Sequence, residues 1–481
     1  MQPMKTLTLV LILLKSMFQP IAAEPTSALT LSNAELGALL QEYKLSGVSV
    51  AVVDNYQIIY SATEGEKVFG SGEKIDENTA FSTASISKPI TALLVAMLEE
   101  QGKLSMDDSV THYLKRWKLS ESDFPQPEKI TFRRLLSHTA GTTQGGFVDY
   151  YEGDDVPSAI DSLNGVKVPR YNTPISLMFE PGTAWAYSGG GYVIVQVAIE
   201  DLTGKSLPQL AQEMLFAPLG LANTTMHQPN TQSFLSNVAS VHNGDLTVIG
   251  SGLPICPQIA PSGMWSSAVD MAKLVIEMQK ALAGKPTQVI SSNVARTTTQ
   301  IETLDAVGGW GLGWMRMEAN GNLDWFSHGG ANTGTGGHIM GTMEKGRGIA
   351  IFGNGGNPSR IPVIDTLTAT IIEKMGWAQP SYAQKDPAPD DVVESMLGTY
   401  QSVFGQSFEI KQENGKLIYQ GNLKLWSADN TGTLIYTGNG QFQIDEYANL
   451  LSIDTSVTPK RIRVSRPGTD KVSYFESSLT Q

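Results

Sequence analysis

Cysteine is almost absent from this 481-residue chain, since Cys256 is its one cysteine. A disulfide within the chain is therefore excluded, and the core must be stable without one. Long apolar runs are missing too. The N-terminal run from Leu7 to Leu14 is far shorter than the roughly 20 residues that a membrane-spanning helix needs.

The same N-terminal segment has the order of a secretory signal. Lys5 precedes the apolar run, and the small residues Ala22 and Ala23 follow it. We therefore predict a cleavable signal peptide over residues 1–23, a secreted or periplasmic protein, and no stable membrane insertion after cleavage. An uncleaved membrane anchor is the alternative, which the shortness of the run disfavours.

Basic patches and metal-binding patterns are also lacking. Lys and Arg number 34 against 47 Asp and Glu, which gives a formal net charge of −13, so no nucleic-acid partner is expected. The 6 histidines show no zinc-type spacing, and the glycine clusters lack the Gly-Lys-Ser/Thr of a phosphate-binding loop. We predict neither a metal site nor a cofactor.

Two regions of strand character frame the larger part of the chain. Residues 47–64 predict a hairpin, and residues 323–353 return to short strands after a mainly helical middle. We therefore predict an α/β (α+β) domain over residues 24–378, with an antiparallel sheet flanked by helices and a helical lobe. Residues 379–390 are predicted as a linker, and residues 391–481 as a small all-β domain, either a barrel or a sandwich.

A serine and a lysine stand three residues apart at the start of an apolar helical pattern, in Ser85-Ile86-Ser87-Lys88. If these residues form the first helical turn, the hydroxyl and the amine project from one face as neighbours. A partly desolvated lysine can then accept the proton of the serine hydroxyl. Such a pair also arises by chance as a serine cap with a solvated lysine, so the motif gains weight only from further residues.

Two further motifs follow in order: a Tyr-Ser-Gly sequence that begins at Tyr187 and a His-Gly-Gly sequence that begins at His328. With Ser85 and Lys88 they make the chain resemble the serine β-lactamase and penicillin-binding-protein superfamily. The elements of that superfamily are Ser-x-x-Lys, a Tyr/Ser-x-Asn loop, and a Lys-Thr-Gly or His-x-Gly strand. The resemblance spans residues 30–377 and is nearest to class C β-lactamases and their esterase and D-aminopeptidase relatives.

The resemblance implies a role for each motif residue. Ser85 would attack the acyl carbon of a small-molecule substrate, and Lys88 and Tyr187 would move its proton. The backbone amides of Ser85 and Ala331 would form the oxyanion hole, and water would release the acyl group without a cofactor. The other residues implied to line the substrate cleft are His328, Gly329, Gly330 and Gln144.

Two departures from the family pattern bear on the substrate. Gly189 stands where the family usually has an asparagine that holds an acylamino group. His328 replaces the lysine that is typical of true β-lactamases. We therefore expect carboxyl esters as the first substrate class, D-amino-acid peptides as the second and β-lactams as the third.

Two alternatives stay open. An α/β-hydrolase would use Ser188 as its nucleophile, but its oxyanion segment precedes the nucleophile, whereas the His-Gly-Gly motif here follows it. A non-catalytic penicillin-binding-like protein would sense cell-wall fragments or scaffold a complex without an adduct at Ser85. The all-β domain could cover the cleft, mediate oligomerisation or bind a partner, and the sequence does not predict the oligomeric state.

Overall fold

The computed structural model describes residues 29–119, 124, 127–228, 230–319, 323–377, 387–401, 407–421, 431–444 and 447–477. The predicted signal peptide and most of the predicted linker lie outside these ranges. Helix α12 (Asp390–Met396) begins at the last residue of that linker. Within the described ranges, no helix has both the length and the apolar content needed to cross a membrane.

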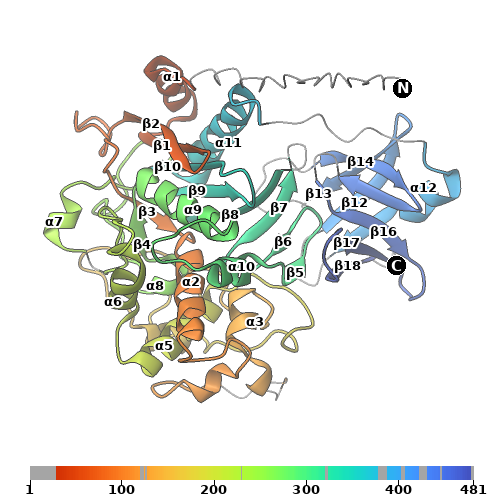
Figure 1. The fold of residues 1–481 in the computed structure, drawn as a ribbon, viewed down its shortest axis with the longest axis horizontal. Coiled ribbons are helices and arrows are strands. Elements are labelled where there is room, and N and C mark those ends of the chain that lie inside the picture. The colour runs from red at the N-terminus through yellow and green to blue at the C-terminus, as the bar shows by residue number, and fades with distance from the viewer. Residues whose placement is uncertain are drawn as a thin grey trace, which may run out of the picture.

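An eight-stranded antiparallel sheet forms the centre of the larger domain, in the order β2-β1-β10-β9-β8-β7-β6-β5 (Figure 1). The predicted hairpin is confirmed as β1 and β2, joined by Asn55 and Tyr56, which both have positive φ as a tight hairpin turn requires. The strands are β1 Gly47–Asp54, β2 Gln57–Gly65, β3 Phe81–Ala84, β4 Met264–Ser266, β5 Thr303–Leu304, β6 Gly309–Trp310, β7 Met315–Ala319, β8 Leu323–Asn332, β9 Thr335–Thr342 and β10 Gly348–Gly353. Of these, β3 and β4 pair with each other apart from the main sheet.

Helices cover both faces of this sheet. Helices α1 and α11 pack on one face, where Val50, Trp325 and Leu367 belong to one apolar cluster. Helix α9 packs on the other face, next to the helical lobe. The helices are α1 Asn33–Tyr43, α2 Ser87–Glu100, α3 Phe132–Leu136, α4 Ala159–Leu163, α5 Gly189–Thr203, α6 Leu207–Ala211, α7 Gln232–Leu235, α8 Ile259–Ser262, α9 Ala268–Leu282, α10 Ser292–Thr299 and α11 Asn357–Lys374, with short turns at Val110–His112, Pro127–Lys129 and Gln212–Phe216.

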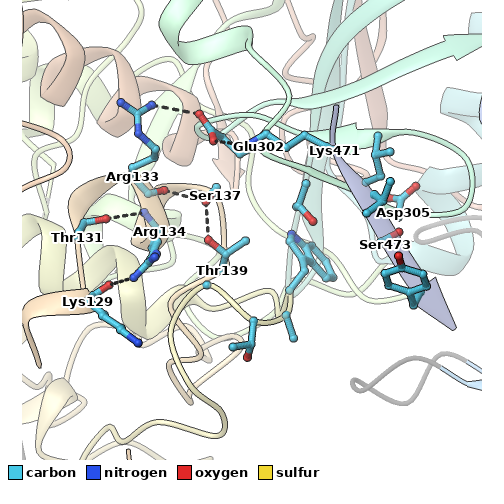
Figure 2. A pocket seen from close by; sticks show the side chains of 18 of the residues that line it. Lys129, Thr131, Arg133, Arg134, Ser137, Thr139, Glu302, Asp305, Lys471 and Ser473 are labelled. Atoms are coloured by element: carbon cyan, nitrogen blue, oxygen red, sulfur yellow. Dashed lines mark hydrogen bonds and ion pairs between the residues drawn. The ribbon is translucent and has the colours of Figure 1, made fainter. Parts of the chain in front are cut away.

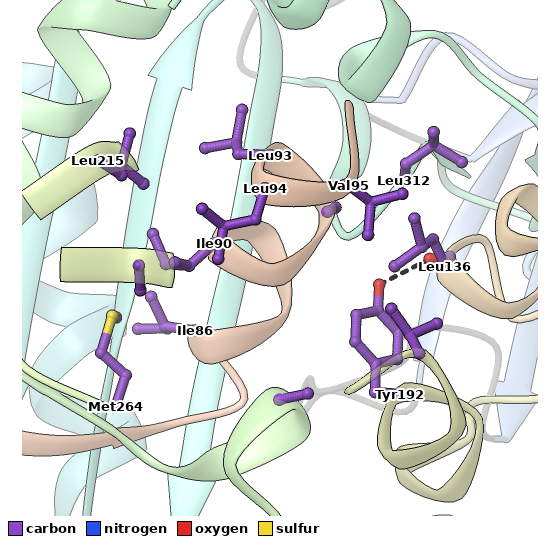
Figure 3. Packing of buried hydrophobic residues seen from close by; sticks show 14 of the residues in the cluster. Ile86, Ile90, Leu93, Leu94, Val95, Leu136, Tyr192, Leu215, Met264 and Leu312 are labelled. Carbon is purple, nitrogen blue, oxygen red and sulfur yellow. Dashed lines mark hydrogen bonds between the residues drawn. The ribbon is translucent and has the colours of Figure 1, made fainter. Parts of the chain in front are cut away.

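Helix α2 runs through the middle of the larger domain and is buried on nearly every side. Figure 3 shows Ile86 and Ile90 on the side of Met264, while Val95 lies on the side of Leu136. A helix that is apolar all round belongs to the core. Packing on every side therefore fixes where the residues just before this helix lie.

The C-terminal region forms a closed eight-stranded barrel. Phe408 and Ile410 on β12 point inward and alternate with exposed residues, as the sequence pattern predicted. The predicted fold class is confirmed, and the all-β domain is a barrel rather than a sandwich. Its strands are β11 Gly398–Gln401, β12 Ser407–Glu413, β13 Lys416–Gly421, β14 Thr431–Gly438, β15 Gln441–Ile444, β16 Leu450–Asp454, β17 Arg461–Ser465 and β18 Val472–Ser477.

The barrel docks beside the β5–β7 end of the sheet (Figure 1). Asn449 of the barrel is fully buried, and its amide donates 2.7 Å hydrogen bonds to the carbonyl oxygens of Asp305 and Gly308. Val307, from the same turn between β5 and β6, belongs to the apolar cluster of the barrel. The barrel therefore fixes the turn that leads into Trp310.

Candidate active site

Ser85 lies in the connection between β3 and α2, two residues before the helix begins at Ser87. It is therefore not part of the first helical turn, contrary to our expectation, although the Lys88 N–H still donates to the Ser85 carbonyl at 3.0 Å. Ala84 just before it has a φ of 50°, which is strained for a residue with a Cβ atom. The Ser87 hydroxyl supports this turn by donating to the Ala84 carbonyl at 2.6 Å.

The Lys88 side chain reaches back from α2 to Ser85. Its Nζ lies 3.2 Å from Ser85 Oγ and 2.9 Å from the carbonyl oxygen of Pro261. The side chain is 1% exposed, and no carboxylate among the described residues forms an ion pair with it. Burial disfavours the charged form and lowers the pKa of Lys88 to about 7. Lys88 is therefore able to accept a proton near neutral pH.

Tyr187 is the third group at this point. Its ring centroid lies 4.7 Å from Lys88 Nζ. Burial raises the pKa of Tyr187, and the nearby Ser85 side chain opposes this rise. The His138 ring packs against the Tyr187 ring, with 4.4 Å between centroids. Tyr187 is thus held beside Ser85 as a neutral phenol at neutral pH.

Ser188 caps helix α5. Its hydroxyl accepts from the Gly191 N–H at 3.0 Å and donates to the Thr143 carbonyl at 2.8 Å. The residue is 1% exposed and does not line the cavities around Ser85. The main sheet is also antiparallel, whereas an α/β-hydrolase places its serine on a mostly parallel sheet. The α/β-hydrolase alternative is therefore wrong.

The His-Gly-Gly motif lies on β8 and borders Ser85. Strand β7 pairs with β8 only as far as Ser327, so residues 328–332 have β9 as their one strand neighbour in the described sheet. Gly330 has to be a glycine, because a Cβ atom there would lie 2.0 Å from the Thr83 carbonyl oxygen. The absence of a side chain lets the edge of β8 pass close to the β3–α2 connection.

His328 stands where true β-lactamases have a lysine, but its ring carries no positive charge at neutral pH. It is 3% exposed, and its Nδ1 lies 2.6 Å from the Gly329 carbonyl oxygen. Burial and the nearby Lys88 charge lower the pKa of His328 to about 3, so the ring is neutral at neutral pH. Across the described ranges, no group of three or more His, Cys, Asp or Glu side chains is placed to hold a metal ion.

Two adjoining chambers meet at Ser85, since Ser85, Ala331 and Asn357 line both. The first, of about 520 Å³, is named here the cationic chamber. Its other lining residues are Lys88, Gly145, Gly146, Phe147, Arg170, Tyr187, Gly189, Ser262, Asn332, Thr333, Gly334 and Gly356. The second, of about 340 Å³, is named the apolar chamber. Its other lining residues are Asp305, Val307, Trp310, Met315, Met317, His328, Gly329, Gly330, Gly337, His338, Arg360, Ile361, Ile364, Asp365 and Tyr447.

All the predicted site residues except Gln144 line these chambers. Gln144 is buried, and its amide donates to the Ser162 carbonyl at 3.1 Å. Its neighbours Gly145 and Gly146 line the cationic chamber instead. A role for Gln144 in substrate binding stays a prediction.

The sequence did not point to Trp310, Asn357 or Arg170. The Trp310 ring lies 5.7 Å from the His328 ring and 5.9 Å from the Tyr187 ring, measured between centroids. Asn357 opens α11 directly after a glycine-rich segment, a signal that could have drawn attention to it. Arg170 lies in a loop without periodic pattern, and nothing in the sequence marks it.

A larger cavity, of about 920 Å³, lies between the region around α3 and the barrel (Figure 2). We call it the interdomain cavity. Glu302 in its wall pairs with Arg133 at 3.1 Å and with Lys471 of the barrel at 3.6 Å. Figure 2 shows these two basic side chains reaching Glu302 from opposite sides. Ser85 does not line this cavity, which marks where the two domains meet.

Comparison with known proteins shows the family and the fold of the chain. The family model described as "Beta-lactamase" matches residues 33–370. Penicillin-binding protein 4 of Amycolatopsis lactamdurans is 26% identical over 379 residues, which cover 76% of this chain and 95% of that protein. Esterase EstB of Burkholderia gladioli is 25% identical over 314 residues, 59% of this chain and 78% of that protein. The solved structure of the octameric penicillin-binding protein homologue from Pyrococcus abyssi shares the fold, with a TM-score of 0.59 and 19% identity over 92% of this chain and 97% of that chain. The chain therefore belongs to the β-lactamase family of serine hydrolases.

Proposed function

We propose that this protein is a secreted serine hydrolase that cleaves an ester or a small amide through an acyl intermediate on Ser85. The observation that carries the proposal is the buried Lys88, whose Nζ lies 3.2 Å from Ser85 Oγ. A lysine with a pKa of about 7 is a base at neutral pH, whereas a lysine in a surface ion pair stays protonated. The secretory part rests on the sequence of residues 1–23, which lie outside the described ranges.

The proposed reaction begins as Lys88 takes the hydroxyl proton of Ser85 and Oγ attacks the acyl carbon. The backbone N–H groups of Ser85 and Ala331 donate hydrogen bonds that stabilise the negative charge developing on the acyl oxygen. Tyr187 stays protonated at neutral pH because burial raises its pKa, and it relays the proton from Lys88 to the leaving group as that bond breaks. Lys88, neutral again, then activates the water that releases the free acid and restores Ser85.

Carboxyl esters are the proposed first substrate class, ahead of D-amino-acid peptides and β-lactams. Gly189 offers no side-chain amide to hold an acylamino group. His328 is neutral where true β-lactamases carry a lysine. One relative of this chain is named an esterase, which supports the same order.

Intact-mass spectrometry tests the proposal, after brief incubation with a fluorophosphonate, a short-chain aryl ester or a β-lactam. We expect a stable fluorophosphonate adduct on Ser85 and rapid release of the phenol from the ester. Ser85→Ala removes the adduct and lowers ester hydrolysis by at least about 10³-fold, because the acyl intermediate cannot form. Heat-denatured wild-type protein controls for reaction at serines that are not activated.

Two outcomes would contradict the proposal in different ways. Full ester hydrolysis by Ser85→Ala would remove Ser85 as the nucleophile. Equilibrium binding of the ester or the β-lactam by the folded protein, without any adduct at Ser85, would favour the non-catalytic penicillin-binding-like alternative. The relative turnover of the reagents ranks the substrate classes.

A further inference from the structure

Arg170 stands at the wall of the cationic chamber on a tight turn. The Tyr171 N–H donates to the Val168 carbonyl at 3.0 Å, and Pro169 occupies the second position, where its fixed φ favours the turn. The Tyr171 hydroxyl accepts from the Gly146 N–H at 3.1 Å and donates to the Gly146 carbonyl at 2.8 Å. These bonds attach the turn to the chamber wall, so the backbone of Arg170 is fixed beside it.

The Arg170 guanidinium lies next to Gly146, where an added Cβ atom would be 3.7 Å from Nη1. No carboxylate in the described ranges lies within ion-pair distance of it, although Asp149 interacts with it electrostatically. The Asp149 carboxyl group is held instead by the Cys256 thiol, at 2.9 Å from one oxygen, and by the Thr333 N–H, at 3.1 Å from the other. Since no hydrogen bond or ion pair of the Arg170 guanidinium is found within the described ranges, its donors are available to a ligand in the chamber.

The cationic chamber is positive within an acidic protein. Arg170 is a permanent positive charge in its described lining, which includes no aspartate or glutamate, whereas the whole chain has a formal net charge of −13. Lys88 also lines the chamber, but it is neutral when it acts as the base. Asn332 and Asn357 line the same wall, and the Asn332 amide donates to Cys256 Sγ at 3.2 Å. A permanent guanidinium charge without an acidic residue beside it in the described wall of a partly enclosed cavity favours a negatively charged ligand group.

The apolar chamber on the other side of Ser85 has a different character. Its apolar wall includes Met315, Met317, Ile361 and Ile364. Arg360 lies in this wall, but its guanidinium donates to the Gly355 carbonyl at 2.8 Å and to Asn357 Oδ1 at 2.7 Å. Two acidic residues, Asp305 and Asp365, line the chamber as well. This side therefore suits an apolar group and disfavours an anion.

We infer that the substrate carries a carboxylate bound by Arg170 in the cationic chamber and an apolar group, across the scissile bond, in the apolar chamber. The inference rests on the proposed function, because Ser85 is the reacting group between the two chambers. A guanidinium presents two parallel N–H donors that match a carboxylate, which a lysine cannot do. Arg170 is thus a specificity-determining residue, and the chemistry at Ser85 does not depend on it.

Matched pairs of aryl esters that differ by one carboxylate test the inference. One pair carries the charge on the acyl chain: a monoaryl ester of adipic acid against the corresponding ester of its monoamide. The other carries it on the leaving group: the hexanoyl ester of 4-hydroxybenzoate against that of 4-hydroxybenzamide. We expect wild-type kcat/KM to favour the charged member of one pair by about tenfold, because the ionic hydrogen bonds form only with that member.

Arg170→Gln should remove this preference, because kcat/KM should fall about tenfold more for the charged ester than for the neutral ester. Lys167→Gln is the matched control, because it removes the same charge from the same loop, where Lys167 pairs with the exposed Asp155 at 2.7 Å. This variant should keep the preference, and added salt should weaken it in the wild type.

The inference is overturned if the wild type shows no preference for a charged ester in either pair. A preference that survives in Arg170→Gln, or that Lys167→Gln removes equally, overturns it as well. Hydrolysis of the neutral esters at full rate by Ser85→Ala would instead contradict the proposed function, so the two failures are separate.

Discussion

The interdomain cavity and the chambers at Ser85 differ in the way their charges are paired. In the interdomain cavity, which is the larger, Glu302 pairs with both Arg133 and Lys471. At Ser85, by contrast, Lys88 is buried against a carbonyl and a hydroxyl oxygen. The larger cavity is therefore the junction between two domains, with its charges paired. The smaller chambers hold a buried lysine without a carboxylate partner in the described part of the chain, and such a lysine can accept and release a proton.

Replacement of Lys88 by methionine should have the largest effect. We expect ester hydrolysis to fall by about 10²–10⁴-fold, the range for loss of a general base. We also expect a higher melting temperature. Unfolded Lys88 holds its proton up to its ordinary pKa of 10.5, whereas the folded protein holds it only below about 7. The wild type therefore loses stability by burying Lys88 at any pH below 10.5, and most at pH 7 and below.

The gain in melting temperature of Lys88→Met should accordingly be larger at pH 6 than at pH 9. Lys471→Met serves as the control from the interdomain cavity, since Lys471 is partly exposed and paired. It should change ester hydrolysis little and give no gain in stability. If Lys88→Met and Lys471→Met lowered ester hydrolysis equally, the chambers at Ser85 would not be distinguished from the interdomain cavity as the active site.

The dependence of kcat/KM on pH should report the titration of Lys88. We expect an acid limb near pH 7, with about a tenfold loss of rate per pH unit below it, because protonated Lys88 cannot accept the Ser85 proton. Other groups of the site titrate elsewhere: burial lowers the pKa of His328 to about 3 and raises that of Tyr187.

Tyr187→Phe tests whether Lys88 or Tyr187 causes the acid limb of the pH profile. It should lower the rate by about 10²-fold through loss of the proton relay and leave the acid limb near pH 7. Stopped-flow or plate measurements of aryl ester hydrolysis from pH 5 to pH 9 check both variants. An acid limb near pH 4 in the wild type would argue that a carboxylate or a histidine, and not Lys88, is the base.

Local patterns in the sequence predicted much of this fold. The two runs of strand character over residues 47–64 predicted a hairpin, and the apolar helical pattern that follows Ser85 predicted a helix. The structure has β1, β2 and α2 there. The order of the Ser85, Tyr187 and His328 motifs predicted that they meet at one site. Such patterns can be read from the sequence because the burial of a side chain depends on the secondary structure of its own segment.

The remaining site residues depend on contacts between segments far apart in the chain. Arg170 reaches the site through Tyr171 and Gly146, and no periodicity encodes that contact. Gln144 shows the converse, since it belongs to a motif-like stretch but has a φ of 64° and a buried side chain. Backbone conformation at one residue decided that Gly145, and not Gln144, borders the chamber.

The smallest expected effect comes from the contact between the domains. Asn449→Ala removes both hydrogen bonds to the turn at Asp305 and Gly308 and leaves those buried carbonyl groups without that donor. We expect the free energy of unfolding to fall by about 2 kcal/mol. We also expect kcat/KM to fall by only a few fold, since the same turn leads into Trp310 beside the His328 ring.

Glu302→Gln is the matched substitution at the same interface, because it breaks the ion pairs with Arg133 and Lys471 across the interdomain cavity. Both basic side chains are partly exposed, so water screens these pairs, and we expect a loss below about 1 kcal/mol with unchanged ester hydrolysis. Chemical denaturation and ester hydrolysis of both variants give the comparison. If Glu302→Gln were the more damaging of the two, the paired charges and not the buried amide would hold the barrel against the active site.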